Sequence, residues 1–191
     1  MPPSRPTPWS RVEEALREQR VTDVLVPGRI DRDDAITRFT PQPLVVFVVL
    51  DEGALRLESA GRYDHLDVRY VDTVTLDGVE LFEDVKEEGD EVALASLCEQ
   101  LFGDGWDRLR CTSVRRFTDT GVQPDPGEGA GHGEDELKCL ALQLEYHFWV
   151  FFNPTWTFGI RIGNAEDMRR WERGYGDHQE DDEEPTGQGD A

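Results

Sequence analysis

The chain of 191 residues is long enough for one domain with a tail to spare, and it carries a net charge of −21 at pH 7. This charge disfavours nucleic-acid binding, because neutralising phosphates requires a basic surface. No apolar run approaches the ~20 residues of a membrane span, so we expect no membrane contact. The three cysteines are an odd number without CxxC spacing, which favours a reduced, cytoplasmic protein.

The acidity is confined to three segments. Residues 72–91, 119–136 and 176–191 together carry the whole net charge of −21, and acids and bases balance in the rest of the chain. The second segment is rich in glycine and cannot bury enough apolar surface to order itself. The sequence therefore predicts a single domain over residues 1–175, with a flexible acidic loop near 119–136 and a disordered acidic tail at 176–191.

The first half of the chain predicts a helix followed by antiparallel strands. The expected elements are a helix at 10–19 and strands at 21–26, 44–50, 54–59 and 65–71. The first strand should end at Pro27 and Gly28, which are turn residues. The run at 44–50 is apolar on both faces, as in a strand that is covered on both sides. Together with the next two strands it predicts a meander.

The second half adds two helices and a long hairpin. The expected elements are a helix at 90–102, a loose strand at 106–117, strands at 140–152 and 156–162, and a helix at 164–174. Residues at 140–152 alternate with a period of two, and Asn153 with Pro154 fits a type I turn between the last two strands. The fold class predicted is α+β, with an antiparallel sheet of about six or seven strands flanked by N-terminal, central and C-terminal helices.

The hairpin supplies the best candidate for a partner-binding surface. Trp149 and Phe151 lie on the strand face opposite Phe148 and Val150, and Trp156 follows after the expected turn. An exposed aromatic patch would suit a protein partner or a small ligand. The alternative is that the first or the last helix covers this second face.

A polar site is the second candidate. Glu145 and His147 are expected on one strand face, and His65 and Asp67 on one face of another strand. If the two strands were neighbours, the four side chains could form an acid–base or metal site. Two outward-facing polar pairs are the simpler interpretation, because the sequence indicates no further ligand. We therefore predict no metal and no cofactor.

Two functional hypotheses follow. The first is a non-catalytic, cytoplasmic protein-binding domain, of the immunity or inhibitor type, that acts on a basic protein partner. It depends on the charge of −21 and the aromatic hairpin. The alternative is a small-ligand-binding protein or enzyme whose site lies between the sheet and a helix and uses His147 and Glu145. The sequence leaves the oligomeric state open.

Overall fold

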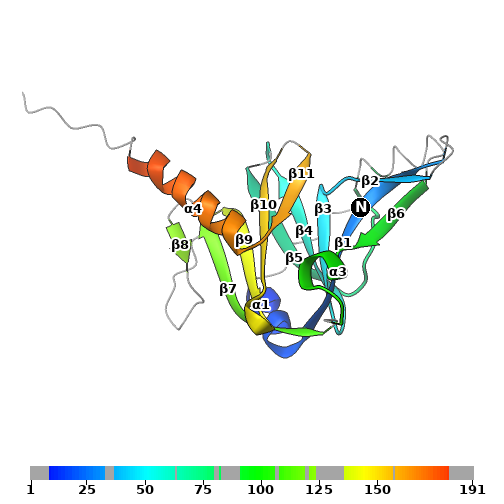
Figure 1. Ribbon diagram of the computed structural model, residues 1–191, viewed down its shortest axis with the longest axis horizontal. Coiled ribbons are helices and arrows are strands. Elements are labelled where there is room, and N and C mark those ends of the chain that lie inside the picture. Colours follow the sequence, from blue (N-terminus) through cyan, green and yellow to red (C-terminus); the bar gives the residue numbers. More distant parts are fainter. Residues whose placement is uncertain are drawn as a thin grey trace, which may run out of the picture.

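The computed structural model describes residues 9–32, 37–62, 64–79, 82, 91–105, 108–118, 121–123, 136–156 and 158–180. Within these residues the protein is α+β, and one antiparallel sheet dominates it (Figure 1). The described helices are α1 (Trp9–Glu18), α3 (Cys98–Phe102) and α4 (Ala165–Glu180).

The sheet has eleven strands among the described residues. They are β1 (Arg20–Asp31), β2 (Arg38–Pro41), β3 (Val45–Leu50), β4 (Ala54–Ala60), β5 (His65–Val71), β6 (Glu91–Ser96), β7 (Leu109–Thr118), β8 (Gly121–Gln123), β9 (Leu137–Leu144), β10 (Trp149–Trp156) and β11 (Gly159–Gly163). The predicted fold was therefore wrong. The antiparallel sheet makes up most of the structure and is larger than the six or seven strands expected. The three described helices do not form a flank around it, since the central one, α3, has only five residues.

The meander of β3, β4 and β5 is confirmed by the register of its strands. Five of the six residues of β3 are buried, as expected for a strand covered on both faces. The predicted end of β1 at Pro27 and Gly28 was wrong, because β1 continues to Asp31. Gly28 allows this, since a Cβ atom there would lie 2.4 Å from the carbonyl oxygen of Thr40 in β2.

The central helix was also predicted wrongly. Residues 91–96 form β6, which pairs with the second half of β1 from Leu25 to Ile30, and only five residues form α3. The strand pairing overrides the helical spacing of the apolar residues, as tertiary contacts often override local propensity. Helix α3 still packs inward, because Phe102 is buried and meets Phe148 edge-on at 5.9 Å between ring centroids.

The long hairpin turns at a different place from the one predicted. The chain reverses after β9 in a short 3₁₀ turn, Glu145–His147, and again before β11. Asn153 and Pro154, where we expected the turn, lie inside β10, next to a shift in its register with β11. Proline is tolerated inside sheets at such irregularities.

The turn between β9 and β10 holds two ordinary residues in a left-handed conformation. Tyr146 has φ of 62° and His147 has φ of 65°. Hairpin turns favour positive φ at both central positions, but asparagine and glycine adopt it at the lowest cost.

The double substitution Tyr146→Asn/His147→Gly should therefore raise the free energy of unfolding by about 1–2 kcal/mol. Urea denaturation measures this free energy. Tyr146→Phe leaves a residue with a Cβ atom at positive φ, so it should change the free energy of unfolding little. An unchanged double variant would contradict the strained turn.

The sheet curls so that its two halves face each other across one core. Its strand order is β11-β10-β9-β7-β1-β3-β4-β5, and β9 packs against β5 while β11 packs against β3 and β4. The backbone N–H of Ile160 in β11 donates to the carbonyl oxygen of Pro43, just before β3, at 2.7 Å. Helix α1 lies against β1, β5 and β7 and adds Val12 and Leu16 to the core.

Helix α4 covers the outer face of the second half of the sheet. Asn164 caps it as predicted, because its side-chain oxygen accepts the backbone N–H of Glu166 at 2.8 Å. Met168 and Trp171 pack onto β7, β9 and β10. The helix continues to Glu180, past Gly174, where we expected its end. Residues 176–180 of the predicted tail at 176–191 therefore belong to α4, and residues 121–123 of the predicted loop near 119–136 form β8. Most of that loop and residues 181–191 lie outside the described residues.

Asp51, in the turn between β3 and β4, joins three separate parts of the chain. Its carboxylate accepts the backbone N–H of Arg20 at 3.0 Å and the guanidinium of Arg108 at 2.6 Å. The hydrogen bond from Arg20, helped by Arg108, lowers the pKa of Asp51 below its usual 3.8. The stabilisation by the ionised carboxylate is therefore present above that value and is lost as the pH falls below it.

Replacing Asp51 tests this contribution. Asp51→Asn should lower the urea midpoint at neutral pH, and the difference from the wild-type protein should shrink below about pH 4. The midpoints of both proteins, measured across this pH range, check the prediction. A difference that stays constant with pH would mean that the charge of Asp51 does not contribute.

Candidate functional site

Helix α4 covers part of the predicted aromatic patch, so its members do not form one exposed surface. Phe151 is 2% exposed and packs between Phe117 and Trp171, with ring centroids 5.8 and 6.2 Å away. Trp149 is half-buried, and the guanidinium of Arg115 lies 5.1 Å from its ring centroid. The side chain of Trp156 lies outside the described residues. Phe151 thus belongs to the core beneath α4, which was the alternative interpretation of this face.

The predicted polar site is not assembled. Glu145 lies in the turn after β9, where its carboxylate accepts the backbone N–H of Arg110 at 2.9 Å, and His147 in the same turn is exposed. His65 contacts Asp64 at 2.8 Å and lies 4.0 Å from Glu136, just before β9. His65 therefore lies near the beginning of β9 and His147 just after its end. Asp67 is in β5, the strand of His65, and so is also separated from His147. Within the described ranges, no group of three or more His, Cys, Asp or Glu side chains could hold a metal ion.

A wide apolar groove lies beside β11. Its volume is about 390 Å³, and side chains from β1, β2, β6, α3 and β11 line it. The apolar residues that line it are Val26, Phe39, Pro41, Pro43, Ala95, Leu97, Ile160 and Ile162. We call this cavity the β11 groove. Ligand pockets typically range from ~300 to 1,000 Å³, so the groove is large enough to hold several side chains.

Exposed apolar side chains accompany this groove. Phe39 is 37% exposed in the groove wall, and Leu94 of the neighbouring β6 is 38% exposed. Figure 1 shows β2 and β6 projecting together with the end of β1 away from the body of the molecule. This extension supplies one wall of the groove, and β11 supplies the other.

Polar groups of the groove lie mainly at its border. Arg161 of β11 is 59% exposed and lies 3.4 Å from the carboxylate of Asp167 in α4. Ser96 donates its hydroxyl to Asp23 at 2.8 Å. Helix α3 contributes Gln100 to the lining of the groove, while Glu99 of the same helix and Asp104 just after it are exposed.

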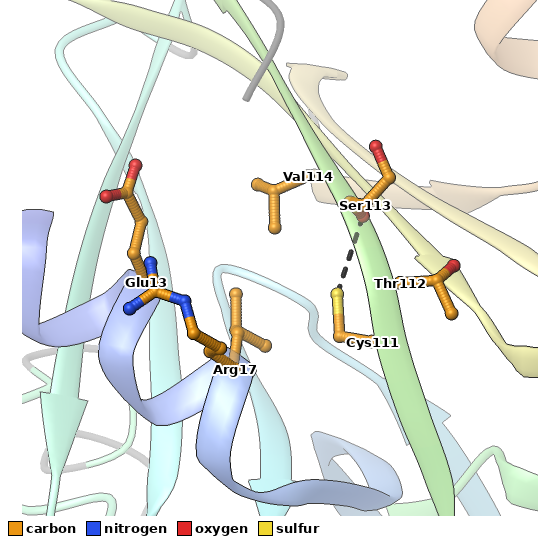
Figure 2. Close-up of a pocket in the computed structure, with 7 residues that line it drawn as sticks. Glu13, Arg17, Cys111, Thr112, Ser113 and Val114 are labelled. Carbon is orange, nitrogen blue, oxygen red and sulfur yellow. Dashed lines mark hydrogen bonds between the residues drawn. The ribbon is translucent and has the colours of Figure 1, made fainter. Parts of the chain in front are cut away.

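Two smaller cavities are less suited to a ligand. Figure 2 shows the first, between α1 and β7, where Glu13 and Arg17 of the helix lie opposite Cys111 and Val114 of the strand. Its volume is only about 130 Å³, and the thiol of Cys111 donates to the carbonyl oxygen of Ser113 at 3.4 Å. The second, of about 190 Å³, lies between α4 and the strands β10 and β11. Both are below the usual size of a ligand pocket.

Comparison of the chain with protein-family models, curated proteins and solved structures gives no match. In the part of the chain that the structure describes, no helix combines the length and hydropathy needed to cross a membrane.

Sequence reasoning missed the β11 groove because two of its walls were not predicted as strands. Phe39 lies in a polar stretch that carries no clear periodicity, and Ala95 lies in a segment whose apolar spacing favoured a helix. The one available signal was an isolated aromatic residue, Phe39, shortly before the apolar strand β3.

Proposed function

We propose that this protein is a non-catalytic binding protein that engages a basic protein partner, with the β11 groove holding an apolar part of that partner. The observation that carries the proposal is the open groove of about 390 Å³ with apolar walls. Interfaces are typically anchored by a few apolar or aromatic side chains that fill such pockets, while polar groups surround them. Phe39 and Ile162 would form the anchor site, next to the buried Ile160.

The charge of the protein supports a basic partner. A net charge of −21 attracts cationic proteins over long distances and raises their association rate. Helix α3, which contributes Gln100 to the groove, also carries Glu99, and Asp104 follows it; both are exposed, and no basic residue lies between positions 98 and 105. Lysine or arginine side chains beside the anchored segment would meet these carboxylates. The proposal therefore includes binding that weakens as salt is added.

A cytoplasmic, reducing compartment is part of the proposal. None of Cys98, Cys111 and Cys139 forms a disulfide. Cys139 is fully buried, and burial raises the pKa of its thiol well above the usual value. A reducing compartment keeps the two partly exposed thiols, Cys98 and Cys111, reduced.

A pull-down with matched variants tests the proposal. Ala95→Trp fills the groove, whereas Thr112→Trp places the same side chain at an exposed position of β7, outside the groove. The wild-type protein and Thr112→Trp should retain a basic protein from lysate at ~50 mM salt and release it at ~500 mM. Ala95→Trp should not retain it, and the purified partner should show the same order of affinity in calorimetry. Equal retention by all three proteins would contradict the proposal.

The volume of the groove also favours a second candidate function, the binding of a small apolar ligand. About 390 Å³ lies within the usual range for such sites, and Arg161 at the border could pair with an acidic group of the ligand. Titration with the apolar anionic dye 1-anilinonaphthalene-8-sulfonate tests it. Salt-insensitive binding that Ala95→Trp abolishes would favour this candidate, in which Glu145 and His147 have no role because they do not line the groove.

A further inference from the structure

The half of the curled sheet that ends in β11 does not extend far enough to cover all of the facing half. β11 is the last strand on its side, and it packs against β3 and β4. The facing half extends further, through β1 to β6. The position that a strand next to β11 would occupy is therefore opposite β1 and β6. The β11 groove lies there, with Val26 of β1, Ala95 of β6 and Ile162 of β11 in its walls.

The backbone of β11 also presents hydrogen-bonding groups on this side. The N–H of Ile160 points away from β10, since it donates to the carbonyl oxygen of Pro43 at 2.7 Å. Alternate residues of a strand direct their backbone groups to the same side. The N–H and carbonyl groups of Ile162 therefore point in the same direction as those of Ile160, along the groove.

We propose that the β11 groove binds an extended, basic peptide segment of the partner as an additional strand along β11. This inference rests on the proposed function and specifies how the partner binds. Main-chain hydrogen bonds to an exposed strand edge provide affinity in such complexes, and pockets for alternate side chains provide specificity. Apolar side chains at every second position would enter the groove beside Ile162 and Ala95. The intervening basic side chains would lie near Glu99 and Asp104.

The free part of the β11 edge sets where the segment pairs. The strand has five residues from Gly159 to Gly163, and Ile160 already bonds to Pro43 at its beginning. An added segment would therefore pair at Ile162 and continue along the groove, and about five to seven residues is the usual length of a strand. A suitable probe is a seven-residue peptide that alternates lysine and valine, labelled with a fluorophore.

Two variants of Ile162 separate strand addition from simple charge attraction. Ile162→Pro removes the N–H of Ile162, and proline is tolerated on an edge strand where its missing N–H faces away from the neighbouring strand. Ile162→Val keeps both the N–H and the apolar side chain. The thermal midpoint of each variant checks that the protein remains folded.

Fluorescence anisotropy of the labelled peptide gives the decisive comparison. The wild-type protein and Ile162→Val should bind the peptide with similar affinity, and Ile162→Pro should bind it about tenfold more weakly, as expected for a lost hydrogen bond at a desolvated site. A copy of the peptide that is N-methylated at the residues facing β11 should lose binding by a similar factor.

The experiments distinguish a failure of strand addition from a failure of the proposed function. If the peptide binds the wild-type protein, Ile162→Pro and the N-methylated copy equally well, strand addition is overturned while a basic partner stands. If the partner pull-down is also unaffected by Ala95→Trp, the proposed function itself is overturned. If light scattering shows a dimer that Ile162→Pro dissociates, β11 pairs with a second copy of this chain and the inference is overturned.

Discussion

Replacement of Gly159 by alanine should lower the free energy of unfolding by about 2–4 kcal/mol. Gly159 has φ of 115°, a conformation that residues with a Cβ atom rarely adopt, and the added Cβ would lie 2.5 Å from the carbonyl oxygen of Pro43. Relief of this clash requires β11 to move away from Pro43, which would also cost the hydrogen bond from Ile160. Urea denaturation with the linear extrapolation measures the change.

Gly103→Ala is the matched control for this prediction. Gly103 also has a positive φ, of 77°, but no atom lies within 4 Å of the position of an added Cβ. With ψ of 177°, its backbone conformation is one that is essentially restricted to glycine, so Gly103→Ala should cost only backbone strain, about 1–3 kcal/mol, without the added clash. If Gly103→Ala and Gly159→Ala destabilise the protein equally, the close approach of β11 to Pro43 is incorrect.

Phe151→Ala should have the largest effect on stability of the changes considered, a loss of about 3–5 kcal/mol. The ring is 2% exposed and packs edge-on against Phe117 as well as against Trp171 of α4. Its removal leaves a cavity between the sheet and the helix, and the helix loses one of its main apolar contacts. Chemical denaturation, followed by circular dichroism, measures the loss.

Phe158→Ala provides the comparison, because Phe158 is an aromatic residue that is 67% exposed. Substitutions at such positions usually change stability by less than about 0.5–1 kcal/mol. The opposite result for Phe151, unchanged stability with lost partner binding, would mean that this residue belongs to an exposed surface and that α4 does not cover it.

The parts of the fold that the sequence predicted well are those in which local pattern and tertiary environment agree. In β3 the apolar residues on both faces predicted a strand covered on both sides, and five of its six residues are buried. At the last helix, Asn164 was identified as the cap because its side chain satisfies backbone N–H groups that every helix leaves unpaired. Such local signals need no knowledge of distant contacts.

The turns of the β9–β10–β11 unit could not be predicted from local signals. Tyr146 and His147 are not typical turn residues, yet they form the turn. The flanking strands β9 and β10 pair on either side of it. Asn153 and Pro154 are typical turn residues, yet they lie within β10 next to a register shift. The alternation of apolar residues with a period of two correctly indicated strands. Because the same alternation occurs before and after a turn, it could not show where the turn lies.

The candidate site was beyond sequence reasoning for a different reason. The walls of the β11 groove come from five elements that are distant in sequence, and the long pairing of β6 with β1 brings Ala95 to its place. Nothing in the residues near Ala95 indicates a partner some seventy residues earlier in the chain. The aromatic residues that seemed most conspicuous, such as Phe151, are used instead to hold α4.

The exchange rate of the backbone N–H of Ile162, measured by NMR with and without the lysine–valine peptide, tests the account most directly. In the free protein this N–H should exchange with solvent much faster than that of Ile160, which is bonded to Pro43, and the bound peptide should slow it. An N–H of Ile162 that is already protected in the free protein, or that is unaffected when the peptide binds, would contradict the proposal that β11 accepts an additional strand.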